Sequence, residues 1–219
     1  MPESKPIVIY GAGGQGRVVL DILRSVPGIV TVGFLDSDEN LHGSMVDNLR
    51  VLGDMRVVPG LLTEYPGIAS VVAIGDNRAR MDIARQLSEL GMPLVNAIHP
   101  RAFISPSAHI GRNVTVASGA IICAHVRIGD HVIVNTGAII EHENNIGDGV
   151  HIAPGAKLAG RVTVDRGAFV GIGAVVIGNL RIGTDAVVGA GAVVLHDVEP
   201  SSVVAGVPAR PIQPKAKGG

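Results

Sequence analysis

The second half of the chain carries apolar residues at a strictly regular spacing. Every sixth residue from Ile104 to Val194 is Ile, Val or Leu. A period of six fits neither an α-helix, whose side chains repeat every 3.6 residues, nor an open sheet, whose side chains alternate. It is typical of a parallel β-helix, in which short strands wind around a triangular prism and successive coils stack. We therefore predict a hexapeptide-repeat β-helix over residues 101–212.

Two positions of each hexad are expected to point into the prism. One is the regular apolar residue, and the other lies two residues before the next apolar residue on the same strand. This second position is small or apolar in almost every hexad, and Asn144 is its one polar residue. Because a buried amide needs hydrogen-bond partners, Asn144 is either one rung of internal bonding or support for a functional group beside it.

Corner side chains can be compared in columns, because three hexads complete one coil and stack about 4.8 Å below the next. The column through His142 has Ala124 on one side, and Gly160 and Gly178 on the other. This pattern predicts an open channel beside the imidazole. A lone corner histidine is more often solvated than catalytic, but no other corner combines such clearance with flanking carboxylates.

Glu143 belongs to the neighbouring column, where it lies between His125 and Arg161. In one interpretation it forms a surface ion pair that contributes little to stability. In the other it orients the ring of His142, which could then take a proton from a substrate, since the ordinary pKa of imidazole is near neutrality. The residues alone leave both interpretations open.

The N-terminal hundred residues follow a different pattern, in which short β runs alternate with amphipathic segments. An apolar run at 7–10 leads through Gly-Ala-Gly-Gly-Gln-Gly at 11–16 into a helical segment at 17–24. Strand, glycine turn and helix form the phosphate-binding unit of dinucleotide-binding folds. The alternative is a tight turn with no ligand. A second β run, 29–35, ends at Asp36, whose carboxylate can bind a ribose hydroxyl.

Further apolar runs at 69–74 and 94–98 flank a helical segment at 78–90. Together these elements complete about half of a doubly wound fold. We therefore predict a Rossmann-like nucleotide-binding domain over residues 1–100. Asp76 and Asn77 follow one strand at the edge where such sheets bind ligands, although Asp-Asn is equally ordinary as a turn or helix cap.

Composition narrows the classes of partner. The chain has 18 basic and 19 acidic residues, so no field of one sign favours nucleic acid or an anionic membrane. Small molecules and copies of the chain itself are the expected partners. Aromatic residues make up only 2 % against 47 % apolar residues, which fits a thin prism filled with Ile, Val and Ala.

Other features concern location and chemistry. Cys123 is the single cysteine, which rules out an intramolecular disulfide and favours the cytoplasm. No apolar stretch approaches the roughly 18 residues of a membrane span, so we expect a soluble protein with a disordered tail at 213–219. The spacing of potential ligands predicts no metal site. We expect His99, His109 and His131 at the surface.

Over essentially its whole length, the chain resembles the sugar acyltransferases that join a short nucleotide-sugar-binding domain to a left-handed β-helix. This group includes UDP-amino-sugar and perosamine N-acetyltransferases and sialic acid O-acetyltransferases. The resemblance lies in YGAGGQGRVV, FLDSD, VAIGDNRAR, LVNAIHPRAFISPSA, NTGAIIEHENNIGDGVHIAPGAKLAG and VVAGVPAR. The chain departs from it at Gln15, where relatives often have His, and at Cys123, where they tend to have Asn. Both positions are expected acceptor contacts.

The resemblance implies transfer of an acetyl group from acetyl-CoA to the amino group of a nucleotide-linked amino sugar, by direct attack in a ternary complex. His142 would be the general base and Glu143 would orient it. The resemblance also implies a homotrimer with the coenzyme between adjacent β-helices. O-acetylation of a sugar hydroxyl, as on sialic acid, would use the same base. The other rivals are a non-catalytic scaffold and a dehydrogenase, which would need a second catalytic domain.

The resemblance further implies two sets of binding residues, and no metal. The acceptor set is Gly11, Gly13, Gly14, Gln15, Gly16, Asp36, Asp76, Asn77, Arg80 and Asn135. The acetyl-CoA set is His151, Ala159, Gly160, Gly171, Ile172, Gly173, Gly189, Ala190, Gly191, Pro208 and Arg210. The nucleotide, whether UDP, GDP, CMP or dTDP, and the acetylated position stay open.

Overall fold

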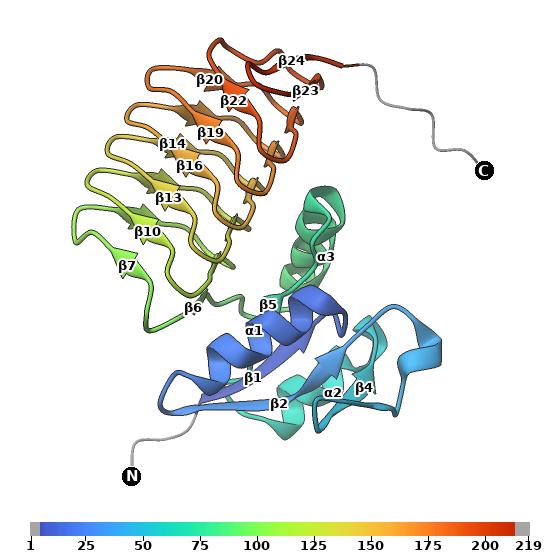
Figure 1. Ribbon diagram of the computed structural model, residues 1–219. Coiled ribbons are helices and arrows are strands. Elements are labelled where there is room, and N and C mark those ends of the chain that lie inside the picture. Colours follow the sequence, from blue (N-terminus) through green and yellow to red (C-terminus); the bar gives the residue numbers. More distant parts are fainter. Residues whose placement is uncertain (1–4, 213–219) are drawn as a thin grey trace.

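The computed structural model describes residues 5–212, which form an N-terminal α/β unit followed by a parallel β-helix (Figure 1). This is the fold class that the two hydrophobic patterns predict. The segment 213–219, for which we expect disorder, lies outside the described residues. None of the helices within residues 5–212 has the length and apolar character needed to cross a bilayer.

The N-terminal unit is a five-stranded sheet with helices packed against it. The strands are β1 (Lys5–Tyr10), β2 (Ile29–Leu35), β3 (Met45–Val46), β4 (Leu49–Gly53) and β5 (Ala69–Val72), in the order β3-β4-β2-β1-β5. Only β3 runs antiparallel to its neighbour. The helices are α1 (Gly14–Arg24), α2 (Val58–Glu64) and α3 (Asn77–Glu89), with single 3-10 turns η1 (Glu39–Leu41) and η2 (Met55–Val57).

Helix α1 packs closely on the sheet because of Gly16 in its first turn. Val19 and Leu23 are buried on its inner face. A Cβ atom at Gly16 would overlap the carbonyl oxygen of Gly11 and press on Phe34, so the helix can approach the turn only with glycine there. The predicted strand, turn and helix are thus present, and α1 begins three residues earlier than the apolar pattern indicates.

The apolar run at 94–98 is divided between two sheets. Leu94 makes a single parallel bridge to Ser70 at the edge of the N-terminal sheet. Strand β6 (Ala97–Ile98) instead pairs with β9 (Thr115–Val116) and begins one face of the prism. The expectation that the whole run completes the nucleotide-binding fold is therefore wrong for its second half, because an apolar run does not indicate which of two sheets it joins.

The β-helix has three faces, each a parallel sheet. The first face holds β6, β9, β12 (Ile133–Val134), β15 (His151–Ile152), β18 (Phe169–Val170), β21 (Val187–Val188) and β23 (Val203–Ala205), extended by the antiparallel β24 (Arg210–Pro211). The second holds β7 (Phe103–Ile104), β10 (Ile121–Ile122), β13 (Ile139–Ile140), β16 (Lys157–Leu158), β19 (Val175–Val176) and β22 (Val193–Val194). The third holds β8 (His109–Ile110), β11 (Arg127–Ile128), β14 (Asn145–Ile146), β17 (Thr163–Val164) and β20 (Arg181–Ile182).

Three edges join these faces. Edge 1–2 consists of turns 99–102, 117–120, 135–138, 153–156, 171–174 and 189–192. Edge 2–3 consists of turns 105–108, 123–126, 141–144, 159–162 and 177–180. Edge 3–1 consists of turns 111–114, 129–132, 147–150, 165–168 and 183–186. Paired residues are eighteen apart, as in Ile122 with Ile140, which confirms the predicted stacking. The regular apolar residues form the core, and only Ile104 and Ile110 in the first coil are half-buried.

The N-terminal unit rests on edge 3–1 (Figure 1). Asn113, which is 1 % exposed, accepts a hydrogen bond from the backbone N–H of Val72 on β5 at 2.8 Å. Its amide nitrogen also lies 3.2 Å from Nδ1 of His131. His131, expected at the surface, is therefore a half-buried junction residue, and burial lowers the pKa of its imidazole.

Candidate active site

Edge 2–3 carries a connected group of three polar side chains, each about half exposed. Nδ1 of His142 lies 3.0 Å from Oε2 of Glu143, and Nε of Arg161 donates to the same oxygen at 3.1 Å. Hydrogen bonds from His142 and Arg161 lower the pKa of the Glu143 carboxyl, which favours its ionised form. A carboxylate only accepts hydrogen bonds, so the neutral ring carries its proton on Nδ1 and a free lone pair on Nε2.

The far side of the imidazole faces a glycine. A Cβ atom added at Gly160 would lie 2.5 Å from Nε2 and from Cε1 of His142, which is too close for any side chain to occupy that space. Glycine at 160 therefore leaves room for the imidazole itself, which fills that space, and the open channel predicted along this edge stays a prediction. Nε2 thus lies against the backbone of Gly160.

Asn144 holds this corner together from within. It is 1 % exposed, and its amide nitrogen donates to the carbonyl oxygens of Glu141 and Ala159, the latter at 2.9 Å. Its amide oxygen accepts from the backbone N–H of Val162 at 3.1 Å. The buried amide thus ties the turn that carries His142 to the next coil, which is the internal rung expected from the sequence, and support for a functional group stays a prediction.

Cys123 lies on the same edge and is half-buried. Burial and the neighbouring carboxylate of Glu141 raise the pKa of its thiol. Because the thiolate is the reactive form, this environment favours a wall residue over a nucleophile.

The glycine turn after β1 presents backbone N–H groups at a helix N-terminus. Gly13 precedes α1, and within the described residues no side chain caps the helix. Gly13 and Gly14 are exposed, and a Cβ at either would meet nothing within 4 Å. Nε2 of Gln15 is shielded from solvent and has no hydrogen-bond partner in the described part of the chain. This arrangement suits an anionic group at the helix N-terminus.

The carboxylate of Asp36 supports this turn. Its Oδ2 accepts the N–H of Ala12 at 2.8 Å, and its Oδ1 accepts the N–H of Asp38 at 3.0 Å. Each oxygen keeps a further lone pair, so binding of a ribose hydroxyl is compatible with the structural role that sequence reasoning missed.

Asp76 and Asn77 mainly serve structure. Asp76 caps α3 by accepting the N–H of Ala79 at 2.9 Å. The amide nitrogen of Asn77 donates to the carbonyl oxygens of Gly167 and Ala168 at 2.9 and 3.1 Å. The helix cap is therefore present, and ligand binding by this dipeptide stays a prediction.

Arg80 differs from its expected role as a nucleotide contact. It is 0 % exposed, and its guanidinium donates to the carbonyl oxygens of His131, Ile74 and Gly149 at 2.8 to 2.9 Å. It also bonds to Oδ1 of Asn77 at 2.9 Å. With these donors engaged and no exposed surface, Arg80 fastens the two units together and is not placed to bind a nucleotide.

His151 and Asn135 lie close to each other but away from His142. His151 is on the first face, 8 % exposed, with Nε2 3.3 Å from the amide nitrogen of Asn135 and its ring edge-on to Phe169 at 5.1 Å. Burial, and then the charge of Arg80, lowers the pKa of His151 to about 4. Within one chain, the structure does not bring this pair to the edge that carries His142.

The residues expected to hold the coenzyme lie along both borders of the second face. Ala159 and Gly160 are on edge 2–3, whereas residues 171–173 and 189–191 are on edge 1–2. Arg210 lines a mainly apolar cavity of about 520 Å³ at the last coil, and Ile172 is 56 % exposed. One chain thus provides two separate parts of the expected site.

Sequence reasoning missed the outer surface between these borders. The outward residues of the second face are Phe103, Ile121, Ile139, Lys157, Val175 and Val193, whereas those of the third face are His109, Arg127, Asn145, Thr163 and Arg181. One face is therefore apolar apart from a single lysine, and the other is polar. This contrast between the two faces can be read from the sequence. The outward residue of each face directly precedes every third of the regular apolar residues.

Known proteins match both units. The model of the PglD N-terminal domain matches residues 6–87. The UDP-N-acetylbacillosamine N-acetyltransferase of Bacillus subtilis is 36 % identical over 120 residues, which are 51 % of this chain and 51 % of that protein. This match therefore spans about half the length of the curated relative.

Solved structures match the whole architecture. PerB from Caulobacter crescentus, in complex with CoA and GDP-perosamine, is 41 % identical with a TM-score of 0.89, over 95 % of this chain and 97 % of that chain. The acetyltransferase domain of PglB from Neisseria gonorrhoeae, in complex with acetyl coenzyme A, is 33 % identical with a TM-score of 0.87, over 95 % and 100 %. The chain therefore belongs to the family of hexapeptide-repeat sugar acyltransferases.

Proposed function

We propose that this protein transfers the acetyl group of acetyl-CoA to the amino group of a nucleotide-linked amino sugar, with His142 as the general base. The observation that carries the proposal is the orientation of the imidazole, which has Nδ1 bound to an ionised Glu143 and Nε2 facing the glycine at 160. The ligands of PerB, CoA and GDP-perosamine, support this pair of substrates.

The chemistry requires a base because only a neutral amine attacks a thioester. The amine nitrogen forms a bond to the acetyl carbon while Nε2 of His142 takes its proton. The carbon–sulfur bond then breaks, and the imidazolium returns the proton to the sulfur, so that the amide and CoA-SH are the products. The carboxylate of Glu143 stabilises the transient imidazolium. Direct transfer needs no acyl-enzyme, in keeping with the raised pKa of Cys123.

The acceptor would bind with its diphosphate at the N-terminus of α1. Gly13 and Gly14 are exposed there, and the next residue, Gln15, carries an Nε2 that has no hydrogen-bond partner within residues 5–212. A remaining lone pair of Asp36 would accept a bond from the ribose. Asn135, near the buried His151, is a further acceptor contact carried by the resemblance.

The proposed assembly is a homotrimer, with acetyl-CoA between the β-helices of neighbouring copies. The apolar second face supports it, since Phe103 is 57 % and Val175 39 % exposed in the single chain. Both borders of this face carry residues of the expected coenzyme set, so a second copy placed over it would complete the cleft. We propose the cytoplasm as its location, in keeping with a single cysteine.

Release of CoA tests the reaction. The purified protein, acetyl-CoA and a panel of UDP-, GDP-, CMP- and dTDP-linked amino sugars should release CoA with at least one member, and free sialic acid should give none. His142→Ala should lower kcat by about 10² to 10⁴-fold. His109→Ala, an exposed histidine on the third face, is the control. Release with sialic acid alone would replace N- by O-acetylation, and no release together with no thermal shift by acetyl-CoA would support a scaffold.

A further inference from the structure

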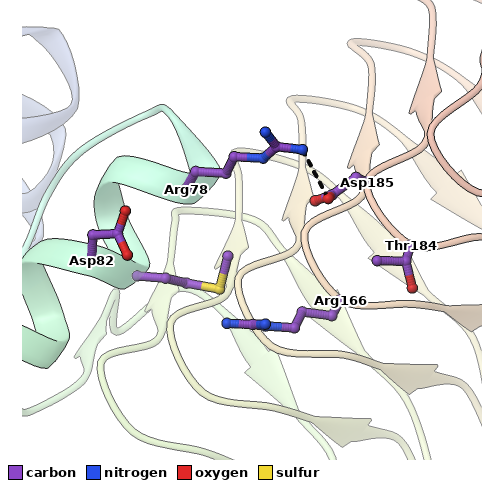
Figure 2. A pocket seen from close by; sticks show the side chains of 6 residues that line it. Arg78, Asp82, Arg166, Thr184 and Asp185 are labelled. Carbon is purple, nitrogen blue, oxygen red and sulfur yellow. Dashed lines mark hydrogen bonds and ion pairs between the residues drawn. The ribbon is translucent and has the colours of Figure 1, made fainter.

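Helix α3 lies along edge 3–1 and contacts successive coils. Asn77 bonds to the turn at 165–168, and Arg78 reaches Asp185 one coil further at 3.0 Å. Figure 2 shows this ion pair bridging the helix and the prism, with Arg166 extending toward the helix across a cavity of about 240 Å³. A helical turn of 5.4 Å nearly matches the 4.8 Å between strands, which lets successive turns of α3 meet successive coils.

A glycine admits the helix to this edge. A Cβ atom at Gly149 would overlap the sulfur of Met81 on α3, and the residue has a φ of +66°, which disfavours other side chains. The turn at 147–150 is therefore shaped to receive α3.

Arg80 is the centre of the contact. Its Nε donates to His131 and its Nη2 to Gly149, both on edge 3–1, whereas its Nη1 donates to Ile74 and Gly75, at 2.9 and 3.2 Å, in the loop after β5. Within residues 5–212 no ion pair joins it. Buried charge is a costly way to gain stability, but a guanidinium fork bound to backbone oxygens on both sides specifies one relative placement of the two units.

The loop that Arg80 holds adjoins the proposed acceptor site. Gly11 of the glycine turn approaches it so closely that a Cβ there would lie 2.7 Å from both the carbonyl oxygen of Ala73 and Cδ1 of Ile74. The same side chain thus contacts the wall of the nucleotide site and the β-helix.

We infer that Arg80 is a positioning residue, which sets where the bound nucleotide sugar lies relative to the β-helix and thereby where its amine meets the thioester. This inference rests on the proposed function. It places the effect of Arg80 on turnover rather than on nucleotide affinity, because its guanidinium makes no hydrogen bond to the glycine turn or to α1 within the described residues. A residue that simply bound the nucleotide would show the reverse.

The test compares Arg80→Met and Arg80→Lys with the control Arg85→Met, an exposed arginine of the same helix that pairs with Glu89. Measurements are kcat and KM with the accepted nucleotide sugar, Kd for GDP and UDP by calorimetry, and hydrogen exchange of residues 74–77 and 147–150. We expect kcat to fall at least tenfold for Arg80→Met and less for Arg80→Lys. Exchange should rise in both segments, and Kd should stay within threefold.

Several outcomes would overturn the inference. These are wild-type kcat in Arg80→Met despite faster exchange, a large loss of nucleotide affinity at unchanged kcat, or unchanged exchange in both variants. If Arg80→Met does not fold, Arg80→Lys decides, since it keeps the charge but not the fork. A wild-type protein that releases no CoA with any amino sugar would remove the proposed function instead, while the exchange data would still show whether Arg80 docks the two units.

Discussion

Two edges of one prism place charged side chains in opposite settings. On edge 2–3, His142 and Glu143 are 50 % and 48 % exposed, and Gly160 leaves room for the ring of His142. On edge 3–1, Gly149 instead admits a helix, and Arg80 is fully buried. A glycine creates space on both edges. Where a half-exposed ring takes that space, the ring can exchange protons with a substrate, and where a helix fills it, the buried charged group beside it fixes geometry.

Asn144→Ala should produce the largest effect, because it removes the buried support of the exposed edge. Three backbone groups, the carbonyl oxygens of Glu141 and Ala159 and the N–H of Val162, would lose their partner. We expect about 3 kcal/mol less stability, given 1–3 kcal/mol for each buried group left unsatisfied and partial relaxation. Urea unfolding measures it, with the exposed Asn145→Ala as control. Equal stability of the two variants would show that the edge does not depend on its inner amide.

The pH dependence of unfolding tests the buried setting near edge 3–1, through His151, whose pKa is influenced by Arg80 of α3. The pKa of His151 falls from about 6.5 when unfolded to about 4 when folded, so the folded state binds fewer protons between these values. Its contribution to stability is complete above pH 6.5 and is lost as the pH falls toward 4, at most about 3 kcal/mol. Urea unfolding of wild type and His151→Phe at pH 4.5, 5.5 and 7 measures it. A slope unchanged in the variant would contradict the assignment.

Periodicity explains which features could be predicted from the sequence, and packing between distant residues explains which could not. The hexads, the glycine beside His142 and the glycine turn could all be predicted, because each follows from a fixed, short spacing of residues in the sequence. The role of Arg80 could not, since it depends on contact with residues 51 to 70 positions away on one of three edges. The resemblance also grouped His151 with edge residues from which one chain separates it, and only the proposed assembly would join them.

Gly160→Ala tests whether clearance matters on edge 2–3. The new Cβ would lie 2.5 Å from Nε2, so the ring must move away from its position, while Gly160 has no positive φ that would strain alanine. We expect kcat to fall about 10- to 100-fold, in line with the loss of a well-placed base, with a melting temperature close to that of wild type. Gly60→Ala, at a position open on all sides, is the control. Retained kcat would mean that the open space serves only packing.

Arg161→Met should have the smallest effect on kcat. It is therefore the most sensitive test of the difference between an exposed cation on edge 2–3 and a buried one on edge 3–1. The side chain of Arg161 is 61 % exposed, and within residues 5–212 its one hydrogen bond goes to the Glu143 oxygen that also holds the ring of His142. Its loss removes the second cause of the lowered pKa of Glu143, but the bond from His142 remains, so the carboxylate stays ionised near neutrality and the ring keeps its orientation. We therefore expect kcat to fall only about two- to fivefold, since exposed charges are screened by water and salt. The deficit should shrink further when kcat is compared in 50 mM and 500 mM salt. A loss as large as that of Arg80→Met would contradict the distinction drawn here, because an exposed cation on edge 2–3 would then be as necessary as a buried one on edge 3–1.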